Sequence, residues 1–138
     1  VDVGHGQLDW RLRNDPRVVV LERTNARHLT ADRLPGPSEL VVCDASFIGL
    51  RTVLAAALDL AAPGAELVAL IKPQFEAGPE AVGKGGVVRD PVVHEAVCAA
   101  VRTWLETSKG WMVLGITPSP ITGPKGNREF LIGARKPL

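Results

Sequence analysis

The segments ELVVCDASF (residues 39–47) and ELVALIKPQFE (residues 66–76) determine the expected fold. In each, four or more apolar residues are followed at once by an ionisable residue, Asp44 in the first and Lys72 in the second. Such runs are typical of strands buried in a parallel sheet, and open α/β sheets bind ligands outside the carboxyl ends of their strands. A charge there is poorly solvated and needs a partner, and a lysine can serve there as a general base. The two residues therefore predict a functional site at one edge of the sheet.

Strand-like and helix-like segments alternate along the chain, which is typical of an α/β fold with a mostly parallel sheet. The expected strands are residues 1–3, 17–21, 40–43, 66–71, 111–116 and 129–134. The expected helices are residues 7–13, 26–34, 50–62 and 91–108, the last with Asp90 as N-cap and Pro91 in its first turn. No helix fits between the last two strands, so they are expected to form an antiparallel pair. The sequence shows no internal repeat and no second domain.

Composition indicates one ordinary globular domain. The 138 residues are 46% hydrophobic and 22% charged, with a net charge of +1 that gives no sign of a strongly basic nucleic-acid binder. The two cysteines, Cys43 and Cys98, are too few for a disulfide scaffold and are expected to be reduced core thiols of a cytoplasmic protein. No apolar run approaches the roughly 20 residues of a membrane span, and no signal peptide is recognisable. His5, His28 and His94 lack metal-ligand spacing with the cysteines, so no metal site is expected.

Two further features belong to the same predicted edge of the sheet. Glu129, in GNREFLIGA (residues 126–134), would by itself be a solvated strand-end charge, but together with Asp44 and Lys72 it indicates a site. The connection of residues 73–90 contains four glycines and is long for a compact domain. We expect residues 76–89 to be the most mobile internal segment, a lid whose Lys84 contacts phosphate.

The first segment, VDVGHGQL (residues 1–8), has two interpretations. As Gly-x-Gly after a strand, it could be the cofactor turn of a nucleotide-binding fold, although the third glycine of that motif is missing. Alternatively it is the second strand of such a fold, and Asp2 is then the acidic residue that binds ribose hydroxyls. Counting strands favours the second interpretation by about three to one, with the first strand and its glycine loop expected upstream.

Five motifs carry a resemblance to a known family. They are VDVGHGQLDWRLRNDPRVVVLERTNAR, VVCDASFIGL, ALIKPQFEAG, VGKGGVVRD and PSPITGPKGNREFL. Over essentially the whole chain, these motifs closely resemble the TlyA or hemolysin-A branch of the FtsJ-like RNA ribose 2′-O-methyltransferases. The resemblance implies a Rossmann-like sheet that binds S-adenosylmethionine, with ribosomal RNA as the substrate.

The resemblance also implies roles for single residues. Asp44, Lys72 and Glu129 match the last three members of the family's Lys-Asp-Lys-Glu catalytic tetrad. Lys72 would be the base, Asp44 would orient the lysines and contact the methionine amino group, and Glu129 would hold the lysine or the ribose. For the cofactor's ribose and adenine, the resemblance points to Asp2, Asn25 and Ala26.

Some parts of the family pattern have no match in this sequence. These are the first lysine, the glycine-rich cofactor loop and a small S4-like RNA-binding domain, all expected before Val1. Residues 1–138 would then be a methyltransferase domain that lacks its N-terminal part, and we expect them to bind S-adenosylmethionine weakly or not at all.

Three other functions compete with methyl transfer. A hemolysin-like membrane-active protein is disfavoured because the chain has neither an apolar span nor a basic amphipathic helix. A non-catalytic RNA-binding module is disfavoured by the low net charge, although five arginines make the first third basic. These are Arg11, Arg13, Arg17, Arg23 and Arg27. An NAD-dependent enzyme is disfavoured because the residues after Lys72 offer no logic for hydride transfer.

Overall fold

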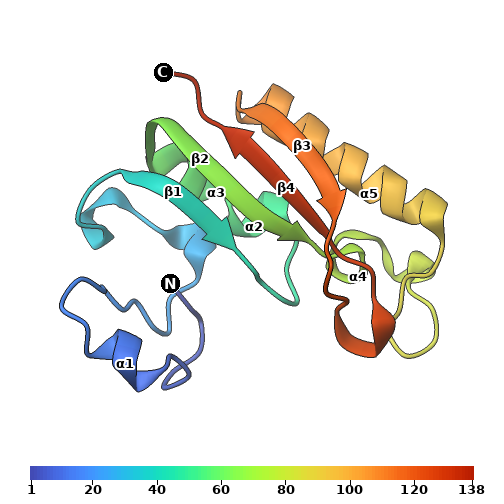
Figure 1. The fold of residues 1–138 in the computed structure, drawn as a ribbon, viewed down its shortest axis with the longest axis horizontal. Helices are drawn as coiled ribbons and strands as arrows, with labels where there is room; N and C mark the ends of the chain where they lie inside the picture. Colours follow the sequence, from blue (N-terminus) through green and yellow to red (C-terminus); the bar gives the residue numbers. More distant parts are fainter.

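The computed structural model describes all 138 residues and contains one four-stranded sheet (Figure 1). Its strands are β1 (Ser38–Cys43), β2 (Ala61–Ile71), β3 (Met112–Pro118) and β4 (Phe130–Arg135), in the spatial order β1-β2-β4-β3. β1 and β2 are parallel, whereas β4 lies antiparallel between β2 and β3. The predicted mixed α/β sheet with an antiparallel C-terminal pair is therefore confirmed.

Three helices cover one face of this sheet. They are α2 (Leu50–Val53), α3 (Ala55–Leu60) and α5 (Pro91–Thr103), and in Figure 1 all three lie behind the strands. Their apolar residues, which include Leu58 of α3, form one core with alternate residues of β2 and β4. The strand residues in this core include Leu67, Ile71 and Ile132. The Asp90 carboxylate accepts a hydrogen bond from the backbone N–H of Val92, as expected of an N-cap.

The opposite face of the sheet is not covered by any helix. Large apolar side chains there remain exposed: Leu40 and Val42 on β1, Val68 on β2 and Met112 on β3. The strands therefore alternate between a buried and an exposed face, although their near-continuous apolar sequence is typical of strands covered on both faces.

Short elements complete the chain. They are α1 (Trp10–Arg13), α4 (Pro73–Glu76) and the 3-10 turns Ala26–His28, Ala31–Arg33, Pro79–Ala81 and Pro124–Gly126. A π-helical turn, Trp104–Ser108, extends α5 to the residue at which the predicted helix ends.

Three predicted elements are not formed. Residues 1–3 and 17–21 are not strands, because neither segment pairs with the sheet, and a single backbone hydrogen bond joins them, from Asp2 N–H to the Leu21 carbonyl at 2.9 Å. Two extended segments without a third strand or a covering helix are marginal at best. Residues 26–34 form two 3-10 turns instead of one helix. Asn25 caps the first turn, and extended backbone at Leu29 and Thr30 separates it from the second.

The boundary between α3 and β2 also differs from the prediction. β2 begins at Ala61, before the Pro63–Gly64 pair that was expected to precede it. The strand accommodates this pair with an irregularity, because its register with β1 shifts between Ser38 and Leu40 and Gly64 has a positive φ of 77°.

Candidate active site

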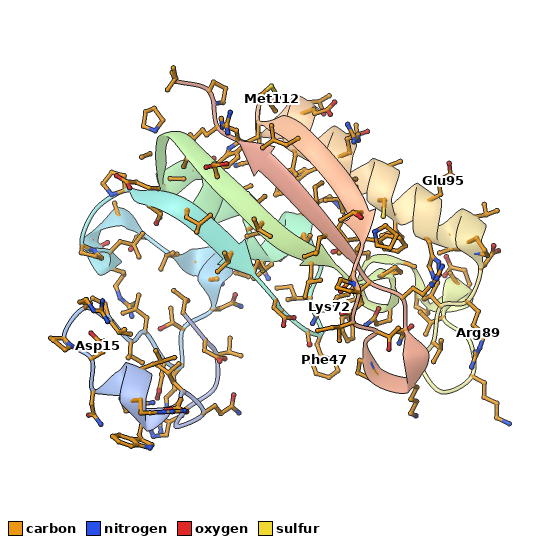
Figure 2. All side chains as sticks on the ribbon, in the orientation of Figure 1. Asp15, Phe47, Lys72, Arg89, Glu95 and Met112 are labelled. Atoms are coloured by element: carbon orange, nitrogen blue, oxygen red, sulfur yellow. The ribbon has the colours of Figure 1, made fainter.

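Lys72 and Asp44 meet at the carboxyl ends of two neighbouring parallel strands. Lys72 directly follows β2, Asp44 directly follows β1, and the Lys72 Nζ lies 2.5 Å from Asp44 Oδ1. The same ammonium donates a hydrogen bond to the Ser46 hydroxyl at 3.3 Å. Figure 2 shows Lys72 and Phe47 at this lower edge of the sheet and Met112 at the opposite end. The prediction that Asp44 and Lys72 approach each other is confirmed.

The two partners differ sharply in exposure. The Lys72 side chain is 11% exposed, whereas the Asp44 side chain is 67% exposed. A buried ammonium is poorly solvated and depends on its acceptors, so Asp44 and Ser46 fix its position. Because the carboxylate is open to solvent, a ligand can also contact Asp44 without entering the core.

Glu129 lies at the same edge because β4 runs in the opposite direction. The antiparallel register pairs Ile71 with Phe130, so the next pair along the ladder brings Lys72 opposite Glu129. Directly opposed residues in such a ladder have Cβ atoms about 4.5–5.5 Å apart. A charged residue at the end of a strand is usually solvated, but Glu129 is buried. Its Oε2 accepts a hydrogen bond from Gln74 Nε2 at 2.9 Å, and Gly123 leaves room for the carboxylate because a Cβ there would collide with it.

Gln74 is a site residue that the sequence did not reveal. Its amide nitrogen binds Glu129, but its carbonyl oxygen Oε1 is buried and has no hydrogen-bond partner. Buried polar atoms without partners are rare in proteins and are often found where a ligand or substrate binds. The only available signal was its place two residues after Lys72.

Glu76 and two phenylalanines fix the loop after Asp44. Glu76 Oε1 accepts a hydrogen bond from the backbone N–H of Leu50 at 2.7 Å, and burial raises the pKa of Glu76 despite this contact. The rings of Phe47 and Phe75 are 5.0 Å apart, and Phe47 is 90% exposed with a positive φ of 65°. The loop after Asp44 and α4 are thus joined at two points, which holds Asp44 and Ser46 against Lys72. A positive φ at a bulky residue is uncommon and marks Phe47 as a position of interest.

No cysteine serves as a nucleophile at this edge. Burial raises the pKa of the Cys43 thiol, and the neighbouring Asp44 carboxylate raises it further. The thiol therefore stays protonated at neutral pH, and both Cys43 and Cys98 are free cysteines.

A family model describes nearly the whole chain. The model of the FtsJ-like methyltransferases matches residues 1–136. This chain belongs to the FtsJ-like methyltransferase family. The recognised motifs and the converging strand ends are therefore those of a methyltransferase fold.

Curated relatives narrow the resemblance within the family. A Mycobacterium tuberculosis protein named 16S/23S rRNA (cytidine-2′-O)-methyltransferase TlyA is 53% identical over 135 residues, which cover 97% of this chain and 50% of that protein. Hemolysin A of Brachyspira hyodysenteriae is 39% identical over 137 residues, covering 95% of this chain and 55% of the relative. The chain thus spans about half the length of the curated relatives it matches.

A solved structure shares the arrangement of the whole chain. A protein from Streptococcus thermophilus named as a hemolysin superposes with a TM-score of 0.91 at 40% identity, covering 98% of this chain and 49% of that one. The name hemolysin thus recurs among the relatives of this methyltransferase domain. No helix in the structure has the length and apolar character needed to cross a membrane.

The expected cofactor residues do not all meet at one place in this FtsJ-like domain. Ala26 and Asp44 line an open pocket of about 350 Å³ along the free edge of β1, and Asn25 directly precedes Ala26. Asp2 instead lines a neighbouring hollow of about 460 Å³, and only Val1 borders both spaces. The Asp2 side chain accepts a hydrogen bond from Gly4 N–H at 2.9 Å, and that of Asn25 accepts one from Arg27 N–H at 3.1 Å.

The predicted lid is only partly exposed. Residues 83–86 are exposed and include Lys84, whereas Val87 and Val88 are buried. The glycine-rich half of the segment thus has the form expected of a lid, and its mobility and contact with phosphate stay predictions.

Proposed function

We propose that residues 1–138 are the methyltransferase domain of an enzyme that transfers a methyl group from S-adenosylmethionine to a ribose 2′-hydroxyl of ribosomal RNA. The observation that carries the proposal is the buried Lys72 ammonium, held by Asp44 and Ser46 at the strand edge where Glu129 also lies. The name of the Mycobacterium tuberculosis relative supports ribosomal RNA as the substrate.

The residues present fit part of S-adenosylmethionine. The pocket beside β1 has apolar walls that suit an adenine, among them Ala26, and Asp44 is the only charged side chain that lines it. The exposed Asp44 carboxylate suits the cofactor's ammonium group, while Asp2 in the adjoining hollow suits its ribose hydroxyls. When bound, S-adenosylmethionine supplies an electrophilic methyl group on a sulfonium centre.

Lys72 is the proposed base. A ribose hydroxyl is a weak acid, so an amine within hydrogen-bond reach assists the transfer by accepting the proton as the oxygen attacks. Burial disfavours a charged amine once its counter-ion is engaged elsewhere. Asp44 is shared between Lys72 and the proposed cofactor position. When Asp44 contacts the cofactor, the Lys72 ammonium would release a proton to solvent, and the neutral amine would then accept the proton of the ribose hydroxyl. Glu129, oriented by Gln74, would hold the ribose or the lysine in line.

Phe47 supports a nucleotide as the substrate. Its ring is 90% exposed beside the Lys72–Asp44 pair and is held by its contact with Phe75. Exposed aromatic rings stack with unpaired bases, which would present the attached ribose to the lysine.

We further propose a larger protein around this domain. A strand and a glycine loop upstream of Val1 would complete the cofactor site, and an S4-like domain would contribute RNA binding. A cytoplasmic location would give such an enzyme access to ribosomes.

The test is methyl transfer by the complete protein with Lys72→Ala. We expect the variant to lose at least about two orders of magnitude in rate while staying folded, because general base catalysis contributes about 10²- to 10⁴-fold. Lys109→Ala is a matched control, since Lys109 also pairs with an aspartate at 2.5 Å and is 12% exposed, but its partner Asp59 lies in the last turn of α3, just before β2 begins, whereas Lys72 follows the other end of β2.

Two results would contradict the proposal. One is near-normal methylation of ribosomal RNA by Lys72→Ala. The other is leakage of liposomes by the complete protein without any methyl transfer, which would favour the membrane-active function suggested by the name of the Brachyspira relative.

A further inference from the structure

We propose that two loops, residues 83–89 and 123–127, together form a basic surface that binds the phosphate backbone of RNA beside the active site. We call these residues the basic loop pair. The inference rests on the proposed function for its choice of RNA, and it adds the surface that would hold the substrate.

A single buried side chain joins the two loops. Asn127 Oδ1 accepts a hydrogen bond from Val88 N–H at 3.0 Å, and Asn127 Nδ2 donates to the carbonyl oxygens of Gly86 at 3.0 Å and Pro124 at 3.2 Å. Asn127 is 3% exposed. Because these bonds use both ends of one buried amide, the loops are fixed relative to each other and form one surface.

Three cations gather on this surface. Lys84 projects from the exposed part of the first loop. The Lys125 Nζ reaches to 3.7 Å from the point where a Cβ at Gly85 would lie, and Arg89 Nη1 reaches to 3.4 Å from the corresponding point at Gly83. The glycines thus leave the space in which cations from two loops approach one stretch of backbone. Gly85 also has a φ of 80°, which other residues rarely adopt.

These cations have no carboxylate partners. Lys84, Arg89 and Lys125 form no salt bridge, whereas three of the five arginines in the basic N-terminal third, Arg11, Arg13 and Arg17, are paired with acidic residues. The backbone N–H groups of Lys84 and Gly85 also donate to no protein acceptor. Unpaired cations and free backbone N–H groups are the donors that proteins use for phosphate oxygens.

The basic loop pair adjoins the catalytic residues directly. Gly123 packs against the Glu129 carboxylate, and Asn127 lies two residues before Glu129. A backbone held by the loops would therefore pass close to Lys72, because Lys72 and Glu129 directly flank the last pair of the ladder, Ile71 and Phe130. This position favours RNA over an anionic membrane as the ligand, because a flat membrane carries no group that must lie beside the buried Lys72.

The experiment measures the salt dependence of binding to single-stranded poly(U) by the complete protein. Each lost phosphate contact on a single strand reduces the slope of log K against log salt by about 0.7, so Lys84→Gln with Lys125→Gln should reduce it by about 1.4. The control carries Arg102→Gln with Arg135→Gln, which removes the same charge from exposed ion pairs outside the basic loop pair. We expect the control to keep the slope of the original protein.

The outcomes separate this proposal from the proposed function. Equal slopes for the two double variants would overturn the surface, and so would binding to phosphatidylserine vesicles without binding to poly(U). Suppose that the original protein methylates ribosomal RNA and that the Lys84/Lys125 variant keeps the original slope of log K against log salt. The proposal that the basic loop pair binds RNA then fails, whereas the proposed function stands. If the slope falls as expected while no methyl is transferred, the surface stands and the proposed activity fails.

Discussion

Gln74 holds Glu129 through one end of its amide and leaves the other end buried without a partner. Replacing Gln74 by methionine removes a donor to a carboxylate, which destabilises by about 1.5–3 kcal/mol, but also removes an unsatisfied carbonyl, which returns about 1–3 kcal/mol. We therefore expect Gln74→Met to change the free energy of unfolding by less than about 1 kcal/mol, because these two contributions offset each other. Methyl transfer should fall strongly, because Glu129 is no longer oriented.

Urea unfolding and a methylation assay on the same preparations check this prediction. Glu95→Met is the control, since Glu95 is exposed on α5 away from the proposed site and its substitution should alter neither measurement. A large loss of stability with normal methyl transfer would give Gln74 a structural role only.

Glu76 should make stability depend on pH. Burial raises its pKa above the ordinary value of 4.5, so in the folded protein it keeps its proton at a pH where the unfolded chain has lost it. Within that window the folded state binds more protons, and the free energy of unfolding falls as pH rises. Glu76→Gln keeps an oxygen for the Leu50 N–H but cannot ionise. Its stability relative to the original protein should therefore increase from below pH 4.5 towards neutral pH.

Urea unfolding across that pH range measures the difference, with Glu95→Gln on the exposed side of α5 as the control for loss of a carboxylate. A difference between Glu76→Gln and the original protein that stays constant, or that shrinks as pH rises, would show that burial does not control this carboxyl group.

Residues that end strands were predictable from the sequence, whereas their partners were not. An ionisable residue directly after an apolar run, such as Asp44 or Lys72, can be recognised from the sequence alone. Ser46, Gln74 and Glu76 act through contacts that span 26 to 55 residues, which only the folded chain brings together. Nothing in the spacing of polar residues within KPQFE distinguishes these side chains from solvated ones.

Among the elements, the link between the basic loops depends on Asn127. Asn127→Ala removes the acceptor of the buried Val88 N–H, and a buried donor without a partner costs about 1–3 kcal/mol. We expect a loss of stability in this range and faster hydrogen exchange at the Val88 amide. Asn14→Ala, at an exposed asparagine that ends α1, should stay within about 0.5 kcal/mol of the original protein. Unchanged exchange at Val88 would show that the loops do not depend on this amide.

The elements that were predicted correctly have a strong local sequence pattern and also pack against another element or pair with another strand. The helix that begins at Pro91 has an N-cap, a proline in its first turn and an apolar stripe, and β4 pairs with both β2 and β3 in the sheet. Residues 17–21 are equally rich in β-branched side chains but have no strand to pair with, so Val19 stays exposed. In such cases tertiary contacts, and not the β-propensity of the residues alone, decide whether a strand forms. Residues 26–34 show the same effect for a helix.

At the scale of the molecule, the sheet has one bare face and two edge strands, β1 and β3. β1 lies at one edge, and its Leu40 and Val42 are 59% and 70% exposed. An exposed apolar edge strand of this kind offers unpaired backbone groups to any other strand. The pocket proposed for the cofactor lies along this same edge, so one of its walls is formed by backbone that has no partner.

This geometry predicts that residues 1–138 alone bind S-adenosylmethionine weakly or not at all. Asp44 and Ala26 line one space, whereas Asp2 lines another, so the group proposed for the ribose does not converge with those proposed for the methionine and adenine ends. Affinity for a ligand of this size depends on polar groups that are already positioned around a largely enclosed pocket. Isothermal titration of residues 1–138, compared with the complete protein, measures the difference, and we expect clear binding only by the complete protein. Micromolar binding by residues 1–138 would instead identify VDVGHG as the cofactor turn, which would shift the assignment of every strand by one βα unit.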